Sequence, residues 1–500
     1  MDSGILNNFG LAVQSLSSIS TLMIMLLGVF SGLIAGALPG IGGAAALAIL
    51  FPITYNLSLS LSILFLLAVY TAAEYGGSIS AILIRTPGTG AAAATVLDGY
   101  PLSQKGFTRK ALTISLIASV SGGFISTFIF MCSAPTLAWI GLQFGPSEMF
   151  ALGVFGLSVV CGLVGKSVVK GFMAAAIGAL LSTVGPSHFS GYRYTFDQSF
   201  LMDGIPIVVA FIGFFAVSEA LKMLIDKTQE GRKVEQKDSI KTDFLTFKEL
   251  RRLYKSIVRG SLIGTFIGII PGAGAGIASF IAYNEEKRWS KTPEAFGTGM
   301  EEGVAAPEAS NNAVVGGCLV PTLALGIPGS AAAALIMGLL IMKGITPGPL
   351  LFRENVDLIY LIFVGLLIIN LLLLGVGYLG LNVFSLVAKV PQRVLGPIVI
   401  VIVLTGIYSY QTNPYHPAMA FVLGVVGYIF EKVKIPLVPL VLAYIMGPIM
   451  EYNFMHALMI SRGDLSVIVK SPICVVILAL ALFSAVFGYI REQRGLKRVN

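Results

Sequence analysis

Four Pro-Gly pairs interrupt long apolar stretches of this chain and carry its most informative chemistry. The pairs begin at Pro39, Pro87, Pro271 and Pro328. Proline removes a backbone N–H and glycine relaxes the backbone, so each pair should interrupt a helix. A helix that restarts after such a break presents unpaired N–H groups and about half a positive charge to whatever lies before it. The pattern therefore predicts anion binding, and a site for several carboxylates where restarts converge.

Residues beside the breaks are the candidate ligands of such an anion. Glycine runs let the backbone approach a ligand closely, and the hydroxyls beside the second and fourth breaks suit carboxylates or ions. Arg85 lies in an apolar stretch, where a fixed charge is expensive and usually functional; it could pair with the substrate, pair with Glu74 or reach an interface. The candidate substrate-binding residues are Gly40, Gly42, Gly43, Arg85, Gly88, Thr89, Gly272, Gly274, Gly329 and Ser330.

A second group of polar residues flanks the breaks at Pro87 and Pro328. Their carboxylate and amide oxygens could hold Na⁺, or a glutamate could carry a proton; the alternative is that they are satisfied polar groups at helix ends. The candidate ion-coupling residues are Glu74, Glu308, Asn311 and Asn312. No catalytic centre, metal site or cofactor is predicted, because no acid pair, serine with a base, or metal cluster stands at a recognisable spacing.

The breaks recur in both halves of the chain. The pattern G-xxx-G-xx-P-G-x-G at 32–42 returns without a gap at 264–274, so that Gly32 corresponds to Gly264 and Pro39 to Pro271. The pattern P-G-T at 87–89 leads into four alanines, and P-G-S at 328–330 does the same. A glutamate precedes the second break in each half. This self-similarity indicates an internal duplication, although the G-xxx-G spacing alone also serves close helix packing.

The composition is typical of a membrane protein. Of the 500 residues 56% are hydrophobic and 12% charged, whereas soluble domains carry about twice that charge. After Asp2 no charged residue appears until Glu74, an interval long enough for more than one membrane span. A β-barrel would instead show alternating segments. The sequence predicts an all-α polytopic membrane protein of about 10–14 membrane segments, including broken or re-entrant helices.

The distribution of charge predicts the orientation. Residues 222–259 hold 11 Lys and Arg against 6 Asp and Glu, which places them in the cytoplasm by the positive-inside rule. The basic C-terminus belongs there too, and the uncharged N-terminus is expected outside. We expect membrane repeat 1 at 1–226, a cytoplasmic linker at 227–243, and a short interfacial helix followed by membrane repeat 2 at 244–500. Because the repeats start from opposite sides, they should have inverted topology. Nucleic acid is not an expected partner.

Several ordered strings resemble the large membrane subunit of the tripartite tricarboxylate transporters. The strings are GALPGIG (36–42), EYGGSISAIL (74–83), PGAGA (271–275), GVAAPEASNN (303–312), LGIPGS (325–330) and GITPGPLLF (344–352). The resemblance implies a carrier in the prokaryotic cytoplasmic membrane that imports citrate-like or other organic carboxylates with an ion gradient. It also implies two partners, a small four-span membrane subunit and a periplasmic or otherwise extracytoplasmic solute-binding protein.

The chain departs from this family at two positions. Arg85 stands where the family usually has Asn, and Gly90 where Pro is common. An added positive charge could change which anion fits, so dicarboxylates and aromatic acids are candidates beside tricarboxylates. The expected mechanism is alternating access coupled to Na⁺ or H⁺. The alternatives are a carboxylate-selective channel and an intramembrane enzyme.

Overall fold

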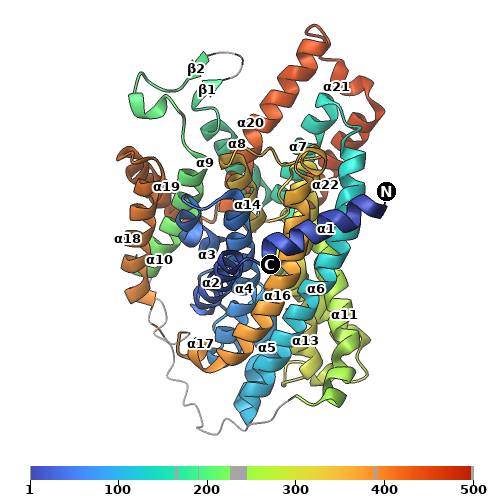
Figure 1. Cartoon of the computed structure of the whole chain (residues 1–500). Coiled ribbons are helices and arrows are strands. Elements are labelled where there is room, and N and C mark those ends of the chain that lie inside the picture. Colours follow the sequence, from blue (N-terminus) through green and yellow to red (C-terminus); the bar gives the residue numbers. More distant parts are fainter. Residues whose placement is uncertain are drawn as a thin grey trace.

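The computed structural model describes residues 2–163, 167–187, 189, 191–225, 245–387, 390 and 392–496. This part of the chain is helical apart from one antiparallel hairpin of β1 (Gly185–Ser187) and β2 (Gly191–Arg193), which projects at the upper left of Figure 1. The helical fold class is therefore confirmed, with this small hairpin as an addition.

The helices fall on either side of the segment 226–244. In the first half they are α1 (Asp2–Leu16), α2 (Ile19–Ala37), α3 (Gly43–Leu50), α4 (Leu59–Ile84), α5 (Ala92–Leu102), α6 (Thr108–Gly141), α7 (Pro146–Leu163), α8 (Val168–Leu181), α9 (Ile207–Phe211) and α10 (Ser218–Ile225). Short single turns and π-helical stretches add η1 (Phe51–Thr54), η2 (Ser103–Phe107), η3 (Ser199–Leu201) and η4 (Ile212–Val217).

The second half likewise consists of long helices joined by short connections. It contains α11 (Phe247–Ile269), α12 (Gly274–Trp289), η5 (Pro293–Ala295), α13 (Glu301–Leu325), α14 (Ala331–Met342), α15 (Leu351–Glu354), α16 (Val356–Leu379), α17 (Leu381–Val387), α18 (Gln392–Gln411), α19 (Tyr415–Lys432), α20 (Leu437–Ile460), α21 (Val467–Lys470) and α22 (Pro472–Leu496).

Eight helical segments among the described residues are long and apolar enough to cross a membrane. They are Ile19–Ala37, Leu59–Ile84, Ala92–Gly141, Pro146–Leu163, Ile207–Ile225, Val356–Leu379, Leu437–Ile460 and Pro472–Gln493. Shorter apolar helices lie at Gly43–Thr54, Val168–Leu181, Ala331–Met342 and Val394–Ser409. The chain is thus a multi-pass membrane protein. The expected count of about 10–14 segments stays a prediction, because it includes helices too short to span alone.

Helices α4 and α13 form the centre of the molecule. Residues 62–83 of α4 and 303–324 of α13 are buried without interruption. A helix buried on every side must be apolar or small all round, and both helices are rich in alanine and glycine. Figure 1 shows both in the lower body of the molecule, with α6 and α16 beside them. The buried polar residues of these two helices are therefore the ones placed to form a site.

Glycines at four-residue spacing fix two parallel helix pairs. A Cβ built on Gly32 of α2 would lie 2.6 Å from the carbonyl oxygen of Val69 on α4, and one on Gly36 would overlap the carbonyl of Ala73. Residue numbers rise together on the two helices, so α2 and α4 run parallel. The G-xxx-G spacing here serves close packing, as its alternative interpretation proposed.

The same arrangement holds in the second half. A Cβ on Gly264 of α11 would overlap the carbonyl of Ser310 on α13, and one on Gly268 would lie 2.9 Å from the carbonyl oxygen of Val314. Helices α11 and α13 therefore also run parallel. Both helix pairs need glycine because any side chain would separate the backbones.

The two central helices run antiparallel to each other. Three contacts follow in order along α4: the Tyr70 hydroxyl with the Cys318 thiol at 3.6 Å, the Glu74 carbonyl with the Asn311 amide at 3.0 Å, and the Ser78 hydroxyl with the Glu308 carboxylate at 2.5 Å. Residue numbers rise along α4 while they fall along α13. The two halves of the chain therefore meet with their central helices pointing in opposite directions.

Of the predicted linker and the helix after it, the structure describes only the helix. The predicted cytoplasmic linker at 227–243 lies outside the described residues. Thr246 forms a capping box with Glu249 and begins α11. The expected short interfacial helix is wrong in length, because α11 continues without a break to Ile269. Its charged first turns and the apolar turns with Gly264 are one helix.

Candidate functional site

All four Pro-Gly pairs end a helix, as predicted. Gly40 (φ 86°) separates α2 from α3, and Gly272 (φ 75°) separates α11 from α12. Arg85 (φ 58°) and Gly326 (φ 71°) end α4 and α13 in the left-handed conformation. That conformation is costly for most side chains but common at helix C-termini.

After α4 and α13 the chain folds back toward the helix it has just left. The N–H of Gly88 donates to the carbonyl of Gly77 at 3.0 Å, about two turns before the end of α4. A Cβ on Gly329 would lie 2.7 Å from the Cβ of Cys318 on α13, at the corresponding place. The restarts of α5 and α14 are thereby brought level with the middle of the central helices.

The restarts of α3 and α14 lie on either side of Tyr70. The Tyr70 hydroxyl is 3.2 Å from the Ser330 hydroxyl, and Ser330 caps α14 by accepting from the Ala333 N–H at 3.1 Å. The Tyr70 ring lies 3.7 Å from a Cβ built on Gly43, the first residue of α3. These residues belong to different halves of the sequence and form one polar surface.

Glu74 occupies this surface. Its carboxylate lies against Gly43, whose built Cβ would overlap a carboxylate oxygen and lie 3.2 Å from the carboxylate carbon. Glu74 is 7% exposed, and no described residue donates a hydrogen bond to its carboxylate. We call Gly42, Gly43, Tyr70, Glu74 and Ser330 the Glu74 cradle.

The restarts of α5 and α12 form a second surface without an acidic residue. A Cβ on Gly276, in the first turn of α12, would lie 3.6 Å from the Gly90 carbonyl oxygen. Gly90 and Gly274 have open space where a Cβ would be, with no atom within 4 Å. The Thr89 hydroxyl accepts from the Ala92 N–H at 3.3 Å and caps α5. We call Thr89, Gly90, Gly274 and Gly276 the open cradle.

Glu308 is held by hydroxyl groups from three helices of the first half. Its carboxylate accepts from Ser78 at 2.5 Å, from Thr95, and from Ser115 at 2.9 Å. Glu308 is fully buried, and none of these partners is charged. Such a carboxylate needs several donors, because burial of an unpaired charge is very costly.

Unpaired amide and hydroxyl groups lie one turn further along the same helices. Neither amide atom of Asn312 has a hydrogen-bond partner among the described residues, and the same holds for the Ser119 hydroxyl and the Asn311 Oδ1. All three residues are buried. Buried polar atoms without partners are rare and call for an explanation such as a bound ion or water. They lie one turn beyond Glu308 on α13 and beyond Ser115 on α6.

Not every candidate residue lies in the two cradles. The Arg85 side chain is exposed, and its guanidinium lies 5.8 Å from the centre of the Tyr100 ring. No ion pair links it to Glu74 within the described ranges. The Gly272 N–H donates to the Gly329 carbonyl at 2.9 Å, so this N–H, like that of Gly88, is already paired within the protein. The Gly272 N–H joins its break to the break at Pro328, whereas the Gly88 N–H holds its break against α4.

Asp98 is a polar centre that the sequence reasoning did not select. It is fully buried near the end of α5, and its carboxylate accepts from the N–H groups of Gly297, Gly299 and Met300 at 2.7–2.9 Å and from the Tyr283 hydroxyl at 2.9 Å. An aspartate in an apolar stretch was the available signal. It fixes the loop before α13 to the first half.

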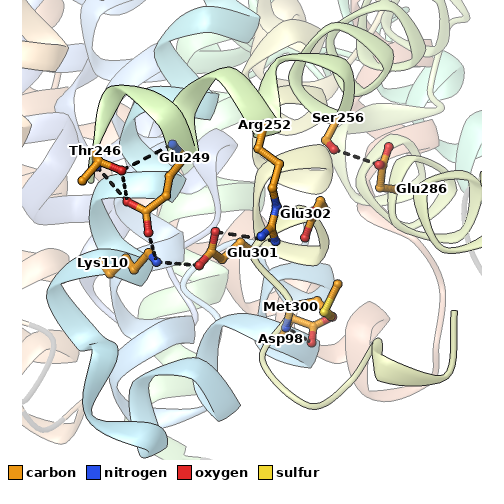
Figure 2. Close-up of polar contacts among 10 residues, drawn as sticks. All are labelled: Asp98, Lys110, Thr246, Glu249, Arg252, Ser256, Glu286, Met300, Glu301 and Glu302. Atoms are coloured by element: carbon orange, nitrogen blue, oxygen red, sulfur yellow. Dashed lines mark hydrogen bonds and ion pairs between the residues drawn. The ribbon is translucent and has the colours of Figure 1, made fainter. Parts of the chain in front are cut away.

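A network of ion pairs lies beside Asp98 and joins the starts of α6, α11 and α13 (Figure 2). Lys110 contacts Glu249 at 2.5 Å and Glu301 at 2.6 Å, and Arg252 contacts Glu302 at 3.0 Å. The Lys110 side chain is 13% exposed. Water and salt therefore weaken its ion pairs less than they weaken ion pairs on the surface. Together with Asp98 these contacts tie the two halves at one end of the central helices.

Replacing Asp98 with asparagine should destabilise this junction. The three N–H groups all donate to one carboxylate oxygen and the Tyr283 hydroxyl to the other. Asparagine would accept the N–H groups with an uncharged oxygen and place its NH2 group where the acceptor of the Tyr283 hydroxyl was, and hydrogen bonds to a charged group contribute about 1.5–3 kcal/mol each. We expect a clear drop in the melting temperature of the detergent-purified protein. Glu294→Gln, in the short turn η5, is the control. An unchanged melting temperature in Asp98→Asn would contradict the role given to this carboxylate.

The chain is similar to known proteins over nearly its whole length. The chain is 36% identical over 492 residues to a protein of Agrobacterium vitis described as an uncharacterized 52.8 kDa protein in the TAR-I ttuC′ 3′ region, covering 98% of this chain and 97% of that protein. It is 37% identical over 232 residues to a second protein of that species, from the TAR-II ttuC′ 3′ region, covering 46% of this chain and 96% of that protein. No solved structure matches.

Residues 22–442 match the tripartite tricarboxylate transporter TctA family, and this range contains both cradles, Glu308 and Asp98. The resemblance seen in the sequence is thereby confirmed, and the function is transport rather than enzymatic catalysis. The chain belongs to the TctA family, the large membrane subunit of the tripartite tricarboxylate transporters.

Proposed function

We propose that this membrane subunit imports organic carboxylates by ion-coupled alternating access and receives them from a solute-binding protein. The carrying observation is the convergence of four helix restarts, from both halves of the chain, on the middle of α4 and α13. Helix N-termini favour negative charge, and irregular backbone at membrane depth is tolerated where it lines a cavity or protein. The arrangement suits a molecule with more than one carboxylate.

We infer that the two halves are inverted-topology repeats. Contacts of equivalent residues support this, because Gly32 meets Val69 in the first half and Gly264 meets Ser310 in the second. The spacing that relates Val69 to Ser310 also relates Arg85 to Gly326, the left-handed ends of α4 and α13. Because α4 and α13 run antiparallel, the copies face opposite ways, as in many secondary transporters.

The same contacts favour re-entrant hairpins. Since α2 and α4 run parallel, the chain between them must return toward its starting side through α3 and η1. The hairpin tip around Gly40 is then level with Ala73, near the middle of α4, because Gly36 of α2 meets Ala73 there. By equivalence, α11 and α12 form a second hairpin entering from the other side.

The correspondence of α4 with α13 corrects the pairing of the two glutamates. Counted from the matched ends of these helices, Glu74 corresponds to Val315 and Glu308 to Leu67. The two carboxylates are therefore not equivalent positions of a duplication. The cradles are chemically different, although their backbones correspond.

We propose the buried polar residues of α4 and α13 as the groups that respond to the coupling ion, Na⁺ or H⁺. They are Glu74, Glu308, Asn311 and Asn312. All four are buried, and the Asn311 Oδ1 and both amide atoms of Asn312 lack hydrogen-bond partners among the described residues. Carboxylate and amide oxygens are suitable ligands for such a cation.

We also propose the setting in which the subunit works. The family is tripartite, which supports a small four-span membrane subunit and an extracytoplasmic solute-binding protein as partners. The basic residues near Lys110 and Arg252 favour the cytoplasmic side for that end of the molecule. The C-terminus would then be cytoplasmic and the N-terminus outside, in the cytoplasmic membrane of a prokaryote.

Transport in proteoliposomes tests this function. The subunit is reconstituted with its membrane partner and binding protein, and labelled citrate, succinate and phthalate are offered with imposed Na⁺ or pH gradients. We expect at least one of these carboxylates to accumulate above its outside concentration under one gradient. Flux that only equilibrates the label under both gradients would instead indicate a carboxylate-selective channel.

Arg85→Asn is expected to change which carboxylates compete for uptake. The exposed guanidinium lies beside the second break, where it adds positive charge near the path to the cradles. Its loss should weaken competition by citrate more than by succinate, because the trianion gains most from a positive field. Arg288→Asn, at the end of α12, is the control. An unchanged competition series in Arg85→Asn would remove this residue from the substrate path.

A further inference from the structure

The two cradles have corresponding backbones but differ in the side chain at the position of Glu74. The carboxylate of Glu74 lies against Gly43 at the start of α3. The correspondence of α4 with α13 puts Val315 at the equivalent position beside the open cradle. Val315 is an apolar buried residue, 3% exposed. One cradle thus carries a carboxylate of the protein, and the other carries none.

Glu74 lies where a carboxylate bound at the helix restarts would lie. Only 7% of the residue is exposed, and within the described part of the chain no side chain or N–H donates a hydrogen bond to its carboxylate oxygens. It lies at the start of α3, near Tyr70 and Ser330, which caps α14. A carboxylate there is favoured by the positive ends of two helices.

From this the geometry points to Glu74 as a built-in occupant of one of two equivalent carboxylate subsites, with the open cradle as the subsite for a carboxylate of the substrate. The inference rests on the proposed function and specifies its site. The space at Gly90 and Gly274, where a Cβ would meet no atom within 4 Å, is the room that a carboxylate needs for close approach to the backbone.

The charge on Glu74 then decides when the substrate can bind. The cradles are neighbours, because a Cβ built on Gly77, one turn beyond Glu74 on α4, would lie 2.7 Å from the backbone nitrogen of Thr89. Two carboxylates in neighbouring cradles repel each other, because the protein around Glu74 screens charge far less than water does. A proton or Na⁺ on Glu74 removes this repulsion. The substrate and the cation are therefore taken up together, and neither binds well alone.

Moving the carboxylate between the cradles tests the assignment. Val315→Glu fills the open cradle, and we expect exchange of the best transported carboxylate from the citrate, succinate and phthalate panel to fall at least about tenfold through charge repulsion. Val315→Gln has the same size without the charge, so a loss that it shares with Val315→Glu is steric, and we expect it to retain at least about threefold more exchange than Val315→Glu because only the glutamate repels the substrate. The double variant Glu74→Val with Val315→Glu vacates the other cradle and should regain exchange.

Two results would overturn the assignment. One is normal exchange in Val315→Glu; the other is equal loss in Val315→Glu and Val315→Gln, which would make the effect steric. Melting temperature and membrane abundance are measured for every variant, and only variants matching the parent protein in both enter the comparison. If the glutamate variant fails to match, Val315→Asp against Val315→Asn gives the same contrast.

The role of Glu74 has its own readout. Glu74→Gln keeps the shape of the cradle without the charge, so exchange should persist while gradient-driven accumulation is lost. Accumulation equal to that of the parent protein would overturn the coupling role. Failure of the parent protein to accumulate any carboxylate would count against the proposed function itself, and the variants separate that failure from a wrong assignment of the cradles.

Discussion

Gly276→Val is expected to abolish carboxylate uptake while the protein still inserts and folds. The built Cβ at this position is in ordinary contact with the Gly90 carbonyl, so the two extra methyl groups of valine would project into the open cradle. Gly276 lies inside α12, and valine is no worse than glycine in a helix interior. The loss should therefore come from the blocked subsite rather than from the helix.

The matched control for this variant is Gly375→Val. Gly375 also lies inside a helix, α16, and a Cβ there would meet no atom within 4 Å. Uptake of the labelled carboxylate should fall at least about tenfold in Gly276→Val, a loss of about 1.4 kcal/mol or more in binding or transition-state free energy. Gly375→Val should match the parent protein. Equal uptake by Gly276→Val and Gly375→Val would show that the contact between α5 and α12 takes no part in substrate binding.

Glu308→Ala should have the largest effect on both stability and transport. The variant would leave the hydroxyls of Ser78, Thr95 and Ser115 buried without their acceptor. Each unsatisfied group costs about 1–3 kcal/mol, and removing the carboxylate also leaves a cavity. We expect a strong decrease in melting temperature and in membrane abundance, and no measurable uptake.

Glu308→Gln separates the structural role from the ionic one. Its amide oxygen still accepts hydrogen bonds, so stability should recover most of the way. Uptake should still lose its response to Na⁺ or to pH if the charge at this position takes part in coupling. A Glu308→Gln protein with the parent's ion response would limit Glu308 to a structural role, and stability as low as that of Glu308→Ala would show that the charge itself is required for folding.

The helix breaks and their recurrence could be predicted from the sequence because proline and glycine act on the local backbone. The pairs at Pro39 and Pro271 end helices where the pattern placed them. The left-handed ends at Arg85 and Gly326 follow from the same chain reversal. Local rules of this kind need no knowledge of which helices are neighbours.

Contacts between distant parts of the chain could not be predicted in this way. Thr95 and Ser115 are separated from Glu308 by 213 and 193 residues, and nothing in their own segments marks them as its partners. The apparent pairing of Glu74 with Glu308 had a similar origin. The second half has a longer connection between its first helix and its central one, and only the helix contacts show where the extra residues fall.

The glycines of the four motifs show why residue type alone does not predict the role of a residue. Gly36 and Gly268 serve packing, since a Cβ on either would press on a neighbouring backbone, whereas Gly90 and Gly274 have open space around them. The N–H of Gly88 holds its break against α4, and the N–H of Gly272 joins two neighbouring breaks. One residue type therefore does three different tasks within four similar motifs.

The most direct test of the account is cross-linking between the two halves across the open cradle. Cysteines are placed by Gly90→Cys and Gly276→Cys in a protein whose native cysteines are replaced, and a short bifunctional reagent is applied in membranes. The account predicts rapid cross-linking that the transported carboxylate slows, and none for the pair Gly90→Cys with Gly375→Cys. Absent cross-linking of the first pair, or a rate that no carboxylate changes, would contradict a substrate site where these helix restarts meet.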